Sequence, residues 1–348
     1  MSPPLPLADL DWVLSLTPGF WSRYRGARLF ITGGTGFIGN WLIQAVQRAN
    51  DVLDSGLELI VLSRDPQRAH NHQPGVFERN DIHLVGGDIT TFAEPQGPWD
   101  LCIHAATDVA NPRQGNGALH LFDSIVTGTR RVLEMASKKG ASRFLLTSSG
   151  AIYGPQPPDL TLMSEGYAGA PSPQQMAAAY GHGKRAAEWL SCAYAAQGSL
   201  DTTIARIFAL VGPGMPLNGP FAAGNFIRDA LAQAPIAVQG DGRTVRSYLY
   251  IADLCVWLLR LLESGQSGEA YNVGSENSLS ILDLATQISQ TAGGVSPVEV
   301  HLAGDASTQP ARYVPDTRKA RQSLELHEYT PLQIALLKTL EWNRLNAS

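Results

Sequence analysis

Short apolar runs alternate with longer segments of helical spacing over the first two thirds of the chain. The apolar runs are rich in β-branched and aromatic residues and are predicted strands; in order they are RLFIT, LELIVLS, IHLVGGD, LCIHAA, RFLLTSS and TTIARIF. A helix is predicted between two of them, from Ser124 to Lys139. Strands that alternate with helices form parallel sheets covered on both faces. The pattern therefore predicts an α/β fold with a doubly wound parallel sheet.

The elements after Phe208 are shorter. GPGMPLNGP is rich in helix breakers, and EAYNVG reads as a strand that could return to the main sheet. The Pro-rich piece from Pro155 to Pro173 is predicted to be a surface loop near the site. Three helices are predicted here, at Asn225 to Gln233, Ile251 to Glu263 and Ser280 to Ala292.

Composition narrows the classes of ligand. The chain has 348 residues, 44% of them hydrophobic, and a formal net charge of -5. Such a chain has no general attraction to nucleic acid or to anionic membranes, so an anionic ligand needs arginines placed for it. Cys102, Cys192 and Cys255 have no spacing typical of a metal site or a disulfide framework. We expect a cytoplasmic protein without a metal, a secretion signal or a membrane span.

A glycine cluster follows the first strand. Gly33, Gly36 and Gly39 form G-x-x-G-x-x-G between the strand and a helix. In that position the glycines permit a tight turn, close approach of a pyrophosphate to the helix N-terminus and close helix packing. We expect a dinucleotide to bind there, with Thr35, Phe37 and Ile38 also at the cofactor; a glycine-rich turn without a ligand is the alternative.

The end of the second strand bears on the choice of cofactor. Ser63 and Arg64 stand where an acidic residue would bind the adenosine ribose. An arginine can pair with a 2′-phosphate, so the cofactor is NAD or NADP with a slight preference for NADP. Pairing of Arg64 with Asp65 at the surface is the alternative.

A second group of residues carries proton chemistry. Tyr180 and Lys184 are four residues apart, hence on one face of a helix, and the lysine ammonium is expected to lower the pKa of the phenol. Ser148 and Ser149 end a predicted strand, where open α/β sheets bind ligands. Ser149, Tyr180 and Lys184 are the predicted catalytic residues.

These motifs together resemble the extended short-chain dehydrogenases/reductases, and more narrowly the NAD-dependent epimerase/dehydratase family that modifies nucleotide sugars. The resemblance covers the chain from about Leu29 to the C-terminus. It rests on GGTGFIG, GDI, HAAT, TSSGAIYG, YGHGK, RIFALVGPG, NFI, GDGRTVRSYLYIADL, YNVG and RYVPD, in this order.

The resemblance implies a Rossmann fold and roles for further residues. We expect an N-terminal extension over residues 1–28, a dinucleotide-binding domain over 29–210 and a smaller substrate-binding α/β region over 211–348, interwoven with it. The implied cofactor-binding residues are Asp88, Ile89, Ala105, Ala106, Thr107 and Thr147, with Tyr180 and Lys184. Those implied for the diphosphate of a nucleotide sugar are Asn225, Arg246 and Arg312, with Ser149 at the sugar.

Departures from the family pattern bear on the reaction. Related dehydratases carry an Asp-Glu pair just after the catalytic serine, decarboxylases a glutamate and C3/C5 epimerases a cysteine; this chain has Gly150 and Ala151. Small residues there are similar to 4-epimerases, which oxidise C4 of the sugar to a ketone and return the hydride to the other face. The resemblance thus implies a C4 epimerase. An NADPH-dependent reductase of 4-keto sugars and an inactive nucleotide-binding homologue stay open.

Two asparagines common in the family are replaced, by Ile125 and by Ala209. The first replacement removes the polar side chain that would hold a proton-relay water, and the second a polar contact near the substrate. Family members also pair through two helices. Because the segments around Ser124 to Lys139 and around Tyr180 are rich in apolar residues, we expect a homodimer built on them.

Overall fold

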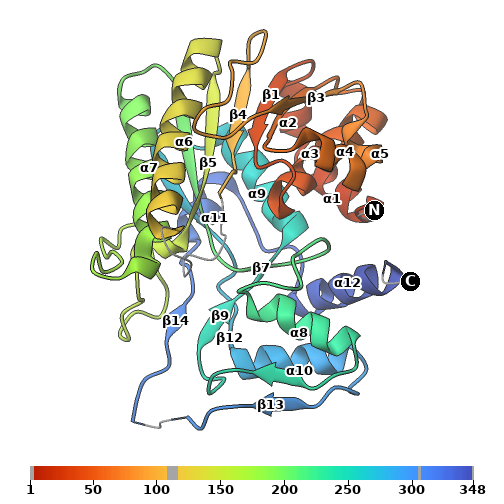
Figure 1. Ribbon diagram of the computed structural model, residues 1–348, viewed down its shortest axis with the longest axis vertical. Helices are drawn as coiled ribbons and strands as arrows, with labels where there is room; N and C mark the ends of the chain where they lie inside the picture. The colour runs from red at the N-terminus through yellow and green to blue at the C-terminus, as the bar shows by residue number, and fades with distance from the viewer. Residues whose placement is uncertain (1–3, 108–116, 305–306, 347–348) are drawn as a thin grey trace. The chain divides into compact units, whose positions relative to one another are not determined.

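The computed structural model of the chain describes residues 4–107, 117–304 and 307–346 (Figure 1). They form two compact units. Unit 1 comprises Met1–Gly154, Ala168–Ile207 and Cys255–Tyr271, and unit 2 comprises Pro155–Tyr167, Phe208–Leu254 and Asn272–Ser348. The chain therefore passes between the units several times.

Unit 1 is built on a seven-stranded sheet of order β11-β6-β5-β4-β1-β2-β3. Strands β1 to β6 pair in parallel, as the alternation of strands and helices predicts. The strands are β1 (Arg28–Thr32), β2 (Glu58–Ser63), β3 (Ile82–Gly86), β4 (Leu101–His104), β5 (Arg143–Ser149), β6 (Asp201–Ile207) and β11 (Glu269–Val273). The doubly wound fold is confirmed, and EAYNVG does supply a strand of the main sheet.

Helices complete this unit. In Figure 1, α6 and α7 run side by side along β5. Buried apolar side chains fill the space between these helices and the sheet, and Phe30 stacks on Trp99 with ring centroids 3.9 Å apart. The helices are α1 (Leu7–Leu16), α2 (Pro18–Arg23), α3 (Phe37–Leu53), α4 (Pro66–His72), α5 (Pro74–Phe77), α6 (Gly117–Lys139), α7 (Ala179–Ala196) and α9 (Ile251–Ser264), with 3₁₀ turns η1 (Gly150–Tyr153) and η2 (Met176–Ala178).

Two features of this unit differ from the sequence-based expectation. The helix predicted to begin at Ser124 begins earlier in the structure, at Gly117, as α6. Residues 1–28 were expected only as an extension, yet α1 and α2 form within them. Val13 and Phe20 are fully buried there, and Gln44 of α3 accepts a hydrogen bond from the Leu5 amide at 3.3 Å. These helices therefore belong to the packing of unit 1.

Unit 2 consists of small sheets and short helices. Strand β9 (Val245–Ser247) lies between β12 (Ser278–Ser280) and β14 (Arg312–Tyr313). Two further pairs are β7 (Leu210–Val211) with β10 (Leu249–Tyr250) and β8 (Ile236–Val238) with β13 (Val298–Val300). The helices are α8 (Ala222–Leu231), α10 (Ile281–Thr291), α11 (Arg318–Leu324) and α12 (Leu332–Leu345).

Two predictions for unit 2 need correction. The helix predicted from Asn225 to Gln233 begins and ends earlier, as α8. The Pro-rich segment is not simply a surface loop, because Met163 is 1% exposed and its amide donates to the Val314 carbonyl at 2.9 Å. Its apolar side chain is part of the core of unit 2.

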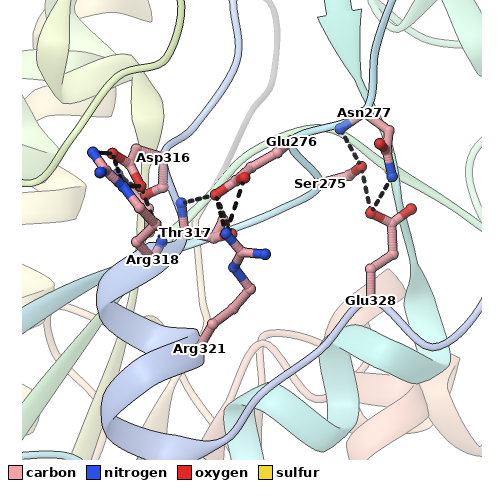
Figure 2. Close-up of polar contacts among 9 residues, drawn as sticks. Ser275, Glu276, Asn277, Asp316, Thr317, Arg318, Arg321 and Glu328 are labelled. Atoms are coloured by element: carbon pink, nitrogen blue, oxygen red, sulfur yellow. Dashed lines mark hydrogen bonds and ion pairs between the residues drawn. The ribbon is translucent and has the colours of Figure 1, made fainter.

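A polar network fixes the segment that follows β14. Figure 2 shows Glu276 between Thr317 and Arg321: its Oε1 accepts from the Thr317 amide and hydroxyl at 2.8 Å, and its carboxylate pairs with Arg321 at 3.2 Å. Glu328 accepts from Ser275 at 2.7 Å. The start of α11 is thereby tied to the loop after β11, which limits the freedom of the strand carrying Arg312.

None of the helices in the described ranges is both long enough and apolar enough to cross a membrane.

Candidate active site

The turn between β1 and α3 brings backbone segments unusually close. Gly33 has φ +72°, and a Cβ there would lie 2.7 Å from the Ala105 carbonyl carbon and the Ala106 amide nitrogen. A Cβ on Gly39 would lie 2.3 Å from the Gly33 carbonyl oxygen. Only glycine fits at these two positions. Gly33 therefore packs the turn against the segment after β4, and Gly39 packs the start of α3 against the turn.

The start of α3 is open to a ligand. Gly36 is the N-cap and offers no side chain, and no side-chain cap is present within the described residues. Thr35 and Gly36 are exposed, whereas Phe37 and Ile38 are half-buried. Uncapped amides at a helix N-terminus, beside a glycine that keeps the approach clear, suit a pyrophosphate. The residues present thus fit the phosphates of a dinucleotide.

The end of β2 carries Ser63 and Arg64. The Ser63 hydroxyl is buried and accepts from the Asp65 amide at 3.3 Å, while Arg64 is exposed. Asp65 caps α4 by accepting from the Arg68 amide at 2.9 Å. The Asp65 carboxylate thus has a structural role of its own as a helix cap.

Asp88 and Ile89 follow β3. Asp88 is exposed, and its Oδ1 accepts from the Thr90 hydroxyl at 2.5 Å and from its amide at 2.9 Å. These bonds, with the charge of Arg64, lower the pKa of Asp88. Ile89 is half-buried and packs against Gly128 of α6, where an added Cβ would lie 2.8 Å from it. Ile89 thus serves helix packing, and its predicted place at an adenine stays a prediction.

A buried histidine orders the end of β4, and the sequence analysis missed it. His104 lies with Nδ1 2.7 Å from the Thr32 hydroxyl and Nε2 3.1 Å from the Thr129 hydroxyl. The Thr32 hydroxyl also accepts from the Ala106 amide at 3.0 Å. Burial and the nearby Lys184 lower the pKa of His104 to about 3, so the ring is neutral. The HAAT motif contains the signal, since its histidine ends a fully buried strand.

Lys184 is fixed by two acceptors. Its ammonium donates to the Thr107 hydroxyl and to the Thr147 carbonyl, both at 2.7 Å. The side chain is buried, which lowers its pKa to about 8. Within the described residues these contacts use two of the three N–H donors, so one is available to a ligand.

Tyr180 and Ser149 meet at the C-terminal edge of the sheet. A hydrogen bond from Ser149 lowers the pKa of the Tyr180 phenol, but burial raises it more, and the net direction is up. The expected lowering by Lys184 is therefore wrong for the protein alone, although the ammonium lies 5.9 Å from the phenol ring centre. The Ser149 hydroxyl oxygen accepts from the Ala151 amide at 3.2 Å, which leaves its proton to donate.

Ser148 points elsewhere. Its hydroxyl donates to Glu188, which pairs with Arg206 at 2.7 Å. The Ser148 hydroxyl is thus committed to Glu188, whereas the Ser149 hydroxyl bonds the Tyr180 phenol. Of the two serines, Ser149 is therefore the one placed beside Tyr180.

The positions that depart from the family pattern are apolar in the structure too. Ile125 is 5% exposed and lies against α7, where a Cβ added to Gly183 would come within 3.1 Å of it. An asparagine side chain there would need a polar partner in this packed contact. Gly150 and Ala151 form the 3₁₀ turn after Ser149. The backbone carbonyl of Ala209 accepts from the Leu249 amide at 3.0 Å.

The predicted diphosphate residues all lie in unit 2. Arg246 is half-buried with its guanidinium 5.0 Å from the Tyr313 ring centre, and burial lowers its pKa. Arg312 bonds Ser278 at 3.4 Å, and its Nε is buried without a hydrogen-bond partner among the described residues. Asn225 donates to the Gly219 carbonyl at 3.1 Å.

The strand register bears on one expectation, which stays a prediction. The two guanidiniums were expected to converge on one diphosphate, but Tyr313 pairs with Arg246 in the parallel β9–β14 ladder, and Arg312 pairs with Val245. Paired residues share a face, so Arg246 and Arg312 leave their strands on opposite faces of the small sheet. β14 is at the edge of this sheet, and one long side chain would have to reach around it for both to meet one ligand.

Comparison with known proteins places this site in a family. The profile of the NAD dependent epimerase/dehydratase family matches residues 29–274. The chain belongs to this family. The resemblance found in the sequence motifs is therefore confirmed, and so is the enzyme class that it implied: an NAD-dependent enzyme of the extended short-chain dehydrogenase/reductase type.

Relatives within the family include sugar-nucleotide enzymes. The chain is 31% identical to UDP-glucuronic acid decarboxylase 1 of Xenopus tropicalis over 93% of its own length and 74% of that protein. It is 29% identical to UDP-glucuronic acid decarboxylase 2 of Arabidopsis thaliana, covering 87% of this chain and 65% of the relative. A solved dTDP-glucose 4,6-dehydratase of Streptomyces venezuelae with NAD is 25% identical with TM-score 0.77, covering 92% of this chain and 97% of that one.

Proposed function

We propose that this family member is a C4 epimerase of nucleotide sugars that works through a transient 4-keto sugar. The observation that supports this most is the group of Ser149, Tyr180 and Lys184 at the end of the parallel sheet, followed by a turn of Gly150 and Ala151 without a carboxylate. Proton exchange at one sugar oxygen needs only these three side chains. Elimination of water would need a further acid or base.

The roles of the three side chains follow from their contacts. The Tyr180 phenol is protonated at neutral pH, because burial raises its pKa, so it can donate a proton to a ketone oxygen at C4. The Ser149 hydroxyl donates to the same oxygen or to the phenolate that is left. The Lys184 ammonium, 5.9 Å from the phenol ring, stabilises that phenolate. Epimerisation begins with oxidation, in which the Tyr180 phenolate takes the proton of the C4 hydroxyl, and the phenol so formed then returns that proton to the ketone oxygen.

A bound nicotinamide cofactor would supply the acceptor and donor of the hydride at C4. The turn of Gly33, Gly36 and Gly39 would hold its phosphates, and the third N–H of Lys184 would bind its nicotinamide ribose. We propose that Arg64 admits a 2′-phosphate, so that NADP is accepted as well as NAD. Arg64 is exposed beside a β2 end that lacks an acidic side chain.

Decarboxylation is the second candidate, because relatives at 28 to 31% identity are UDP-glucuronic acid decarboxylases. Oxidation at C4 of a glucuronic acid gives a β-keto acid, which can lose carbon dioxide without a further base. The absence of a carboxylate at Gly150 and Ala151 disfavours this reaction less than it disfavours dehydration. Reduction of a 4-keto sugar with NADPH requires the same three residues and stays as the third candidate.

Product analysis separates these reactions. The purified protein is incubated with NAD and one nucleotide sugar at a time, UDP-glucose, UDP-galactose or UDP-glucuronic acid, and in a further reaction with NADPH and a UDP-4-keto sugar. The products are identified by NMR, with Tyr180→Phe as the matched control. We expect a mixture of C4 epimers that keeps every carbon. A pentose product would assign a decarboxylase, and turnover only of a 4-keto sugar with NADPH would assign a reductase. If no nucleotide sugar is turned over but nucleotide is retained, the protein is a binding homologue.

A further inference from the structure

A buried charge network lies one helical turn from Lys184, and the proposed chemistry does not use it. Arg206 donates to Glu188 through Nε at 3.1 Å and through its terminal nitrogen at 2.7 Å. Ser148 donates to the same carboxylate, and Arg206 also donates to the Tyr153 hydroxyl at 2.8 Å. The Glu188 and Arg206 side chains are only 9% and 14% exposed. Burial of two charges is costly, so such a pair calls for a reason.

The network is placed directly behind the catalytic groups. Ser148 precedes Ser149 in β5 and is paired in register with Arg206 of β6. On α7, Tyr180, Lys184 and Glu188 follow one another at intervals of four residues, so they lie along one face of the helix. A carboxylate is thus held one turn beyond the buried ammonium.

Charges around Lys184 come from few groups in the described part of the chain. On α7 they are Tyr180, which is neutral, and Glu188. From β4 comes His104, which is neutral because burial lowers its pKa to about 3. From β6 comes Arg206, whose charge faces Glu188. Burial lowers the pKa of Lys184 to about 8, and Glu188 acts in the opposite direction.

We propose that Glu188 is a positioning residue whose carboxylate keeps the buried Lys184 protonated, while Arg206 and Ser148 hold that carboxylate in place. The catalytic meaning of this charge rests on the proposed function, because the ammonium serves the Tyr180 phenolate there. The alternative is a purely structural link between β5, α7 and β6. That link would affect stability equally at every pH.

The first test needs no substrate. The free energy of unfolding is measured against pH for the wild type and for Lys184→Met. The difference between the two values at each pH reports the contribution of the Lys184 side chain. Its pKa is about 8 in the folded protein and 10.5 as a free side chain, so the unfolded chain binds more protons between these values. Lys184 therefore destabilises the fold below pH 8, and the difference should shift in favour of the wild type as pH rises through this window, by about tenfold in the folding constant per pH unit.

The same difference is then measured in the Glu188→Gln background. Loss of the carboxylate should lower the pKa of Lys184 in the folded protein, which is the lower end of this pH window, by about one unit or more. Glu134→Gln, which removes an exposed carboxylate on α6, should leave the window in place. An unchanged window in Glu188→Gln would overturn the proposal.

Glu188→Gln leaves Arg206 buried without its anion, and this variant could fail to fold. The double variant Glu188→Gln/Arg206→Gln leaves no unpaired charge, and Glu188 is the residue of this pair whose charge acts on Lys184. It should show the same downward shift of the window. If neither variant shows it, the network is structural only.

The second readout is the pH dependence of kcat/KM for whichever nucleotide sugar is turned over, and in particular the pH at which kcat/KM falls on the alkaline side. It should move to lower pH by about one unit in Glu188→Gln. Ser148→Ala keeps both charges and the bonds from Arg206 that hold the carboxylate, so it should leave that pH where it is. If no nucleotide sugar is turned over, the proposed function fails, whereas the unfolding measurements still decide the role of Glu188.

Discussion

Replacing Tyr180 with phenylalanine removes one oxygen atom and keeps the ring that packs in the core of unit 1. Because the phenol exchanges the proton at C4, we expect turnover to fall by about 10² or more. Cofactor binding and thermal stability should change little. Steady-state kinetics and cofactor titration check this, and wild-type turnover in Tyr180→Phe would remove the tyrosine from the mechanism.

Arg64→Asp tests the choice of cofactor. A carboxylate at the end of β2 would accept hydrogen bonds from the ribose hydroxyls of NAD and would repel a 2′-phosphate. We expect the ratio of NADP to NAD affinity to fall by about tenfold or more, measured by fluorescence titration with the reduced cofactors. Arg68→Asp, on α4, is the control. An unchanged ratio would show that Arg64 does not reach the cofactor.

At the scale of elements, the small sheet of unit 2 gives a prediction about the substrate. Charge-assisted hydrogen bonds contribute roughly 1.5 to 3 kcal/mol each, so Arg246→Ala and Arg312→Ala should each weaken binding of a nucleoside diphosphate by about tenfold or more. Calorimetry with UDP, GDP, CDP and dTDP measures this, with the exposed Arg344→Ala as control.

The opposite faces of the two arginines make the outcome informative. Loss of affinity in one variant only would assign the diphosphate to that face of the sheet. If neither variant binds any diphosphate more weakly than the wild type, the nucleotide-sugar interpretation is contradicted. NADH affinity should be unchanged in both.

The sequence predicted the helices and strands whose apolar residues follow a regular pattern. The parallel strands were predicted from their apolar runs, and α9 and α10 lie within one residue of their predicted bounds. The contacts made across the sheet were not visible in the same way: His104 with Thr32 and Thr129, or Glu188 with Arg206, join residues far apart in the sequence. A local pattern cannot show which buried polar groups satisfy one another.

The same limit explains one error in the site and one question that the sequence leaves open. The Tyr180 pKa was predicted from its spacing to Lys184, but the dominant effect is burial by the rest of the unit. Convergence of Arg246 and Arg312 on one diphosphate was predicted from the motifs and stays a prediction, because the register of β9 and β14 shows only that the two side chains leave on opposite faces. The spacing of charged residues can be read from the sequence, whereas the burial of a side chain and the register of paired strands cannot.

At the scale of the whole molecule, we predict a homodimer through α6 and α7. These helices pack on one another, and their outer sides expose Leu119 at 67% and Trp189 at 69%. Exposed large apolar side chains on neighbouring helices are typical of an interface. Trp189→Asp should give a monomer at micromolar concentration in sedimentation. Trp12→Asp, on α1, is the matched control and should remain dimeric; a monomeric wild type would contradict the prediction.

The order of the main sheet also has a consequence for how the protein is made. Strand β6 ends at Ile207, but its outer neighbour β11 begins only at Glu269 and ends at Val273, 66 residues later. At roughly 5 to 20 residues per second, a ribosome needs about 3 to 13 seconds to bridge that interval. During this time the nascent sheet presents β6 as an open edge, with unpaired amides and carbonyls that could pair with another chain. Slow decoding between these strands should therefore favour aggregation on the ribosome, and a chaperone that binds nascent chains should act before residue 273 emerges.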